Sequence, residues 1–194
     1  MLIPGAGDRA WHWHLVAGEL RERGHDVVAV DLPCDDESAG LTEYADTVVE
    51  AIGERSDLVV VAHSLGGFTA PLVCARVPVD LLVLVAGMVP EAGEKGEDWW
   101  ANTGYVTAPG DYGDDEIALY LHDVPPELAA EAVAKGRDQT MTPMREPWPL
   151  DGWPDVPTRY LLCRDDRVFD EIDGGHCVYL SRPAELAARL ESRE

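Results

Sequence analysis

The chain has 194 residues, which is enough for one domain that buries a hydrophobic core. Hydrophobic residues make up 46% of it and charged residues 27%, a composition typical of a folded globular protein rather than a disordered one. Asp and Glu total 37 against 15 Lys and Arg, and the resulting net charge of -22 disfavours binding to nucleic acid or to an anionic membrane surface.

The four cysteines are far apart in the sequence and form no C-x-x-C pair, so neither a zinc site nor a redox motif is indicated. We interpret them as reduced thiols and expect a cytoplasmic protein. The sequence does not open with a basic segment followed by a long apolar run, and no apolar stretch approaches the roughly 18 residues that span a membrane. We therefore expect neither secretion nor membrane insertion.

Four short apolar runs predict strands that are buried on both faces of a parallel sheet. These runs alternate with segments of helical spacing, and this alternation predicts an α/β fold with a doubly wound, mostly parallel sheet. The predicted strands are residues 27–30, 58–62, 81–86 and 160–163, and the predicted helices are residues 11–23, 41–54, 65–77 and 183–191.

The alternation stops in the segment 89–156, which is rich in Pro and Gly and has helical patterns only near residues 115–122 and 126–135. We predict that it is a small helical cap, and that residues 1–88 and 157–194 form the core. Its tryptophans either line an apolar substrate pocket or anchor the cap. They are Trp99, Trp100, Trp148 and Trp153, of which the first three are the candidate substrate-binding residues.

Ser64 stands between a predicted strand and a predicted helix, in the stretch Ala62-His63-Ser64-Leu65-Gly66-Gly67. This is the G-x-S-x-G nucleophile elbow with Ala at the first small position. Small residues two before and two after the serine let the strand and the helix approach each other. The free N–H groups of a helix N-terminus favour a developing negative charge, so the Leu65 N–H is a candidate oxyanion donor. The alternative is a serine that only caps the helix.

Three stretches together carry a family resemblance. They are LIPGAGDRAWHWHLVAGELRERGHDVVAVDLP at 2–33, the elbow, and YLLCRDDRVF at 160–169 followed by GGHCVYLSRPAELAARL at 174–190. In this order they resemble the α/β-hydrolase superfamily, in the branch of small plant-type methylesterases and hydroxynitrile lyases with their bacterial relatives. The resemblance implies an α/β-hydrolase fold and covers most of the chain outside the predicted cap.

The resemblance implies a role for each matching residue. Ser64 is the nucleophile, His176 the general base and acid, and Asp166 the carboxylate that orients the histidine. The backbone N–H of Ala6 is the second oxyanion donor beside that of Leu65. Pro4 replaces the usual histidine of the family's H-G-x turn, and this change leaves the backbone role of Ala6 intact.

The residue types agree with this assignment. A serine hydroxyl needs a base that titrates near neutral pH, and histidine is that base. Among the six histidines, only His176 lies in a Gly-Gly loop with no evident packing role. Asp165 and Asp166 both follow a predicted strand at the edge where α/β sheets place their sites. Registration on the family pattern favours Asp166, with Asp165 as the alternative.

The interval between Asp166 and His176 is too short for the fold. A crossover between parallel strands needs about a dozen residues or more, and the family has a whole helix here. We expect that residues are missing from the sequence near Phe169 and Asp170, and that a few are missing before Met1.

These observations predict a carboxylesterase: a serine hydrolase that acts on a small carboxylic ester through an acyl-enzyme, with no cofactor and no metal. The hydroxynitrile lyases of this branch carry a threonine and a lysine where this chain has Gly5 and Cys177, which argues against cyanohydrin cleavage. The alternatives are a small-ligand receptor on the same scaffold, a lyase, or a hydrolase of carbon-carbon bonds. We expect a small-molecule ester as the partner, with no nucleic acid and no membrane; a homodimer is compatible with the sequence.

Overall fold

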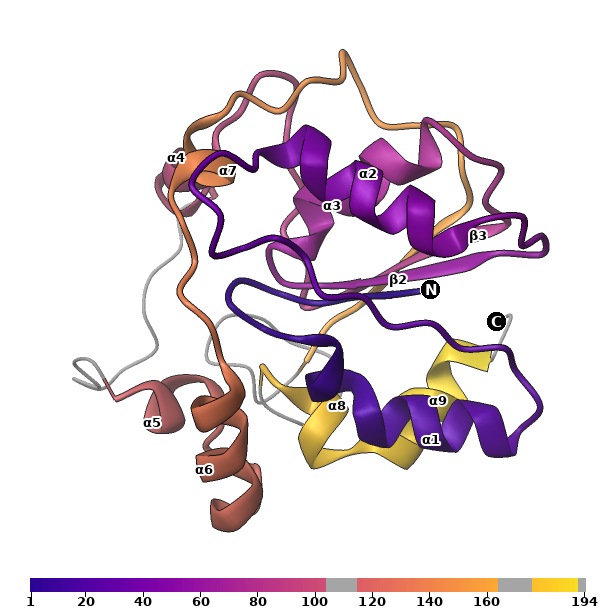
Figure 1. Ribbon diagram of the computed structural model, residues 1–194, viewed down its shortest axis with the longest axis vertical. Helices are drawn as coiled ribbons and strands as arrows, with labels where there is room; N and C mark the ends of the chain where they lie inside the picture. Colours follow the sequence, from indigo (N-terminus) through magenta and orange to yellow (C-terminus); the bar gives the residue numbers. More distant parts are fainter. Residues whose placement is uncertain (104–114, 164–175, 192–194) are drawn as a thin grey trace.

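A computed structural model describes residues 1–103, 115–163 and 176–191 of the chain. Its four parallel strands form one sheet in the order β1-β2-β3-β4. Helices cover both faces of this sheet (Figure 1), so the predicted α/β fold with a parallel sheet is confirmed. The strands are β1 (Leu2–Ile3), β2 (Val59–His63), β3 (Leu81–Val85) and β4 (Thr158–Leu161).

Two helical layers enclose the sheet. In Figure 1, α2 and α3 lie above it, and α1, α8 and α9 lie below it. The lower layer combines segments from both ends of the chain, since α1 packs against α9. The upper helices are α2 (Leu41–Ile52) and α3 (Gly66–Cys74), and the lower elements are η1 (Ala10–Trp13), α1 (His14–Glu22), α8 (Val178–Ser181) and α9 (Pro183–Glu191).

The central strands are apolar along their length because each of their faces packs against a helical layer. Successive residues of β2 and β3 point to opposite faces of the sheet and join two different core clusters. Val60, Ala62, Leu82 and Leu84 belong to the cluster of α2 and α3, whereas Val61, Val83 and Val85 belong to that of α1, α8 and α9.

The predicted strand at residues 27–30 forms a single bridge, between Leu2 and Ala29. Two hydrogen bonds hold it: the Leu2 N–H donates to the Val28 carbonyl at 2.8 Å, and the Val30 N–H donates to the Leu2 carbonyl at 3.3 Å. The neighbouring strand β1 has only two residues, so no longer ladder forms. The last predicted strand is displaced, because β4 begins two residues before the run at 160–163.

Four short helices lie in the described part of the segment 89–156, and two of them fall where helical spacing predicted them. Helices α4 and α7 pack together, and Trp99 of α4 joins the core cluster of α2 and α3. Helices α5 and α6 lie on the other side, beside the lower layer (Figure 1). The bounds are α4 (Gly96–Asn102), α5 (Glu116–Tyr120), α6 (Pro126–Lys135) and α7 (Thr142–Arg145). The cap boundaries at 89 and 156 stay a prediction.

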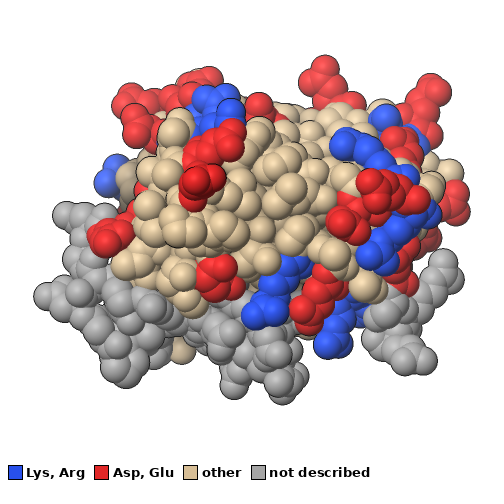
Figure 2. Space-filling view, turned by 90° about the horizontal axis from the view of Figure 1, so that it is seen from below, with Lys and Arg blue, Asp and Glu red and all other residues tan. Residues whose placement is uncertain are grey.

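The surface seen in Figure 2 carries uncharged atoms across its centre and charged side chains toward its margins. One ion pair ties the two ends of the chain together, since Arg23 at the end of α1 meets Glu191 of α9 at 2.7 Å. Within the described residues, the helices are too short or too polar to cross a membrane.

The contact of α3 with the sheet predicts a stability difference between two glycines. A Cβ at Gly67 would overlap the Met88 carbonyl oxygen, whereas a Cβ at Gly18 in α1 would meet nothing within 4 Å. We expect Gly67→Ala to lower the free energy of unfolding by about 1–3 kcal/mol or more. Gly18→Ala, the matched control, should raise it by about 0.5–1 kcal/mol because it removes a flexible residue from a helix.

Urea unfolding of both variants measures the difference. Equal stability of Gly67→Ala and the wild type would show that α3 can withdraw from the sheet at no cost.

Candidate active site

Ser64 occupies a sharp turn between β2 and α3, with a backbone φ of +48°. A non-glycine residue in this region is strained by about 1–3 kcal/mol, so the surroundings must hold it there. Three main-chain bonds do so: the Ser64 N–H donates to Val85 at 3.3 Å, and the Ser64 carbonyl accepts from Met88 at 2.9 Å and from Gly67 at 3.0 Å. The elbow predicted from the sequence has the backbone that its function requires.

The double glycine after the serine brings α3 against the ends of β1 and β3. A Cβ at Gly66 would lie 2.8 Å from the Pro4 carbonyl oxygen and 3.2 Å from Ile3 Cγ2. Only glycine permits this approach at Gly66 and Gly67, and the approach puts the N-terminus of α3 beside the loop that follows β1.

That loop is a tight turn from Gly5 to Asp8, and it presents Ala6. The Asp8 N–H donates to the Gly5 carbonyl at 3.4 Å, and Gly7 has a φ of +69°, which suits glycine in a type II turn. A Cβ at Gly5 would lie 3.2 Å from Ser64 Cβ, so the turn lies against the serine.

The two predicted oxyanion donors lie at one cavity with the serine. Ala6, Ser64 and Leu65 all line a cavity of about 760 Å³. Within the described part of the chain, neither the Ala6 N–H nor the Leu65 N–H donates a hydrogen bond. Both amides are therefore available to an oxygen atom held beside Ser64.

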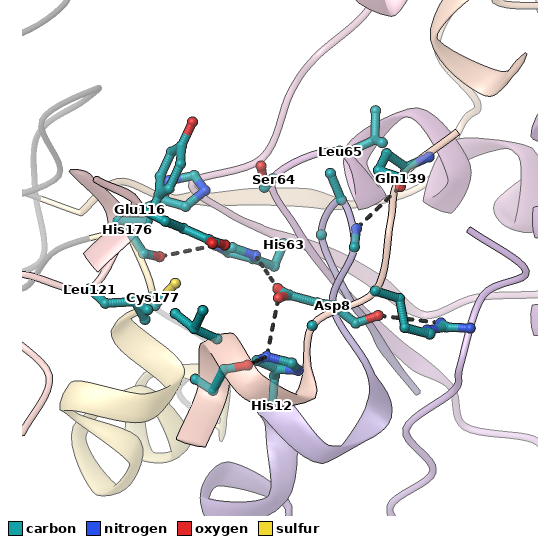
Figure 3. A pocket seen from close by; sticks show the side chains of 18 of the residues that line it. Asp8, His12, His63, Ser64, Leu65, Glu116, Leu121, Gln139, His176 and Cys177 are labelled. Atoms are coloured by element: carbon teal, nitrogen blue, oxygen red, sulfur yellow. Dashed lines mark hydrogen bonds and ion pairs between the residues drawn. The ribbon is translucent and has the colours of Figure 1, made fainter. Parts of the chain in front are cut away.

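His176 lines the same cavity from the loop before α8 and is 7% exposed. The imidazole of His63 lies beside it, with the ring centroids 4.5 Å apart. His63 Nε2 donates to the His176 carbonyl oxygen at 3.0 Å, because a carbonyl can only accept. The side chain of His63 thus anchors the backbone of the candidate base (Figure 3).

A cluster of polar side chains continues from His63 along the lining of the cavity. The Tyr179 hydroxyl donates to Asp8 Oδ2 at 2.7 Å, and the same oxygen lies 3.9 Å from His63 Nδ1. His12 Nδ1 accepts from the Arg9 N–H at 2.9 Å, so its Nε2 carries the proton that faces Asp8 Oδ1 at 3.4 Å and the Ala132 carbonyl at 3.2 Å. Asp8 is thus the acceptor around which this cluster is arranged.

Burial sets the protonation of two members of the cluster. It lowers the pKa of His63 well below 6.5, with a further contribution from the charge of His176 when protonated, so His63 is neutral. Burial, reinforced by the Asp8 carboxylate, raises the pKa of Tyr179 well above 10, so its hydroxyl stays a donor. His63 Nδ1 then has no proton to give, and it has no hydrogen-bond partner among the described residues.

The structure brings one of the three candidate tryptophans to the cavity. Trp100 lines it, whereas Trp99 and Trp148 are buried outside it. The Trp99 indole donates to the Val89 carbonyl at 3.2 Å, and the Trp148 indole donates to the Phe68 carbonyl at 3.0 Å. These two residues anchor their segment to the core instead of meeting a ligand.

The candidate acids fall outside the described residues. Asp165, Asp166 and the interval near Phe169 and Asp170 all lie within 164–175. Within the described residues, no group of three or more His, Cys, Asp or Glu side chains could hold a metal ion.

Sequence reasoning missed several cavity residues. Asp8, His12, Arg137 and Gln139 line the cavity, and the sequence predicted a site role for none of them. The available signal was the position of Asp8 and His12 soon after the first strand, at the edge where α/β folds bind ligands.

Comparison with known proteins decides the family. The sequence model of the alpha/beta hydrolase family matches residues 1–189. The chain belongs to this family. The resemblance to the plant methylesterase branch with its bacterial relatives is thereby confirmed, because curated plant methylesterases match almost the whole chain.

Methylesterase 7 of Arabidopsis thaliana is 26% identical over 243 aligned positions, which cover 98% of this chain and 94% of that protein. The chain has 194 residues, so the relative carries residues for which this chain has no counterpart. A probable esterase of rice, PIR7A, is 35% identical over 108 positions, and the match spans 48% of this chain but only 40% of the length of that relative.

A solved extracellular alpha/beta-hydrolase from a Paenibacillus species superposes with a TM-score of 0.81 at 20% identity, covering 100% of this chain and 98% of that one. Polyneuridine aldehyde esterase gives a TM-score of 0.80 at 19% identity, covering 97% and 96%. These likenesses establish the α/β-hydrolase fold.

The neutral, buried His63 predicts a pH dependence of stability. The unfolded chain binds a proton at this residue below pH 6.5 and the folded protein does not, so stability falls as the pH falls below that value. Between pH 7 and 5.5 we expect this group to remove about 1 kcal/mol from the free energy of unfolding.

Urea unfolding at the two pH values measures this loss. His63→Gln keeps an N–H donor for the His176 carbonyl and should lose less stability than the wild type over that interval. His14→Gln, which replaces an exposed ring, is the control. Equal losses in the wild type and His63→Gln would contradict the prediction.

Proposed function

We propose that this protein is a serine hydrolase that cleaves a small, neutral carboxylic ester through an acyl-enzyme intermediate. The observation that carries the proposal is the strained turn at Ser64, which lies at one cavity with His176 and with two amides that donate no other hydrogen bond in the described residues. The names of the esterase relatives support it.

In the first half of the reaction, Ser64 Oγ attacks the ester carbonyl carbon while His176 takes the hydroxyl proton. The carbonyl oxygen becomes an oxyanion, to which the Ala6 and Leu65 N–H groups donate. Collapse of this intermediate breaks the bond to the alcohol oxygen, which leaves with the proton from His176. The acyl group then remains on Ser64.

In the second half, water attacks the acyl carbon while His176 accepts one of its protons. The second tetrahedral intermediate collapses, Ser64 recovers its proton, and a carboxylic acid leaves. Asp166 is proposed to hold the imidazole in the tautomer that this cycle needs, with Asp165 as the alternative.

The surroundings of Gly5 favour hydrolysis over the lyase reaction. A Cβ at Gly5 would lie 2.9 Å from His63 Nδ1 and 3.2 Å from Ser64 Cβ, so a threonine does not fit there without a shift. The close packing around Gly5 therefore disfavours the threonine hydroxyl that the resembling lyases carry at this position.

The charge of the cavity favours a neutral ester. Among the described residues, Asp8, Asp35, Glu116 and Asp138 line it, against one guanidinium, that of Arg137, which pairs with Asp35 at 3.2 Å. A carboxylate in this cavity meets like charges, which disfavours an anionic substrate and favours release of the acid product.

The nucleophile is tested with p-nitrophenyl acetate. Ser64→Ala should lower kcat by about 10⁴-fold or more, because no other group in the cycle can form the acyl-enzyme. Ser38→Ala, an exposed serine outside the cavity, is the control and should keep full activity. Hydrolysis retained by Ser64→Ala would contradict the proposal. Absence of turnover with any short ester, together with tight binding of a small ligand, would indicate a receptor.

The acid is tested by two neighbouring substitutions. Asp166→Asn should lower kcat by about 10⁴-fold, because an amide stabilises the wrong tautomer of the histidine. Asp165→Asn is the matched control and should keep kcat within about tenfold of the wild type. A reversed pattern in the measured ester hydrolysis would assign the acid to Asp165.

A further inference from the structure

The tip of the oxyanion turn is bonded to a segment that follows α6. Both polar groups of the Gly7 backbone are engaged there: its N–H donates to Gln139 Oε1 at 3.2 Å, and its carbonyl accepts from the Arg137 N–H at 2.8 Å. Gly7 directly follows Ala6, so these bonds fix the peptide next to the proposed oxyanion donor.

The side-chain NH2 group of Gln139 has no donor left for a ligand, and its oxygen is engaged by Gly7. While Oε1 accepts from Gly7, Nε2 donates to the Tyr44 hydroxyl at 2.9 Å and to the Thr140 carbonyl at 3.0 Å. Gln139 lies at the cavity beside the turn (Figure 3). Its amide is nonetheless directed at the turn and at Tyr44 of α2, which is 1% exposed.

Further contacts make this junction stiff. Arg9 Nε donates to the Lys135 carbonyl at 2.8 Å, and the Thr140 N–H donates to the Cys34 carbonyl at 2.8 Å. A Cβ at Gly7 would lie 2.6 Å from the Arg137 carbonyl oxygen, so the two segments are in direct contact. Gly7 is thus in contact with residue 137, and its two hydrogen bonds oppose movement of the turn away from this segment.

We infer that Gln139 is a positioning residue of the oxyanion hole: its side-chain amide, braced by Tyr44, holds the Gly5–Asp8 turn so that the Ala6 N–H faces the oxyanion. This inference rests on the proposed function. An oxyanion donor works only within a few tenths of an ångström of its productive place, and a misplacement of about 1 Å costs on the order of 10²-fold in rate.

The experiment measures steady-state hydrolysis of p-nitrophenyl esters. Gln139→Ala should lower kcat by about 10–100-fold and leave KM within about threefold, because the interaction acts on the transition state alone. Gln139→Met keeps the length of the side chain without its hydrogen bonds and should behave in the same way. Tyr44 lies outside the cavity. Tyr44→Phe should lower kcat by a few-fold, because it removes the hydroxyl that accepts a hydrogen bond from the Gln139 amide.

A matched control and a second readout separate positioning from folding. Thr140, the residue next to Gln139, has a buried hydroxyl with no hydrogen-bond partner among the described residues, and Thr140→Val should leave kcat unchanged. Binding of a trifluoromethyl ketone, which forms an oxyanion on Ser64, should weaken in each variant by the same factor as kcat/KM. Labelling with a fluorophosphonate, run to completion, counts the folded sites, so that kcat refers to these alone.

If Gln139→Ala fails to fold, Gln139→Met and Tyr44→Phe carry the test. A kcat within twofold of the wild type in both Gln139 variants, while Ser64→Ala is inactive, would overturn the inference and leave the proposed function intact. A raised KM with unchanged kcat would also overturn it, because it would mean that Gln139 binds substrate. Activity retained by Ser64→Ala would overturn the proposed function instead.

Discussion

The left-handed backbone of Ser64, with its φ of +48°, persists because β3 and the residues after it hold both its N–H and its carbonyl. The turn reverses the chain so sharply that α3 must begin against the sheet, and only Gly66 and Gly67 leave room for it there. The same approach puts the N–H groups of the first turn of α3 beside the loop after β1. One strained residue therefore decides where the proposed nucleophile, the helix N-terminus and the proposed oxyanion turn meet.

The parallel sheet supplies the rest of the geometry. The loops after β1 and β2 leave the same edge, so Gly5 and Ser64 are neighbours although they are far apart in the sequence. His176 comes to this edge from the C-terminal part of the chain, and the His63 side chain holds its carbonyl. The side chain one residue before the proposed nucleophile thus fixes the backbone of the proposed base, which links two members of the catalytic group through the elbow itself.

The sequence was sufficient to predict those structural features that depend on local residue pattern. Apolar runs predicted β2 and β3 because both faces of the sheet are covered, and the elbow motif predicted the turn because its residue types are required sterically. The pattern could not predict that residues 27–30 would form only one bridge, because that depends on the length of the neighbouring strand. The roles of Trp148 and Gln139 also stayed hidden. Each is set by a single contact distant in sequence, with Phe68 and with Gly7.

The junction of the Gly5–Asp8 turn with residues 135–140 connects the segment after α6 to the proposed oxyanion hole. A turn closed by one 3.4 Å hydrogen bond is weak on its own, and glycine at its corner adds freedom that an oxyanion donor cannot tolerate. Bonds from Arg137 and Gln139 remove that freedom from outside the turn. Any displacement of the segment therefore displaces the Gly7 peptide, so that a shift of the residues after α6 would reach the proposed oxyanion donor at Ala6.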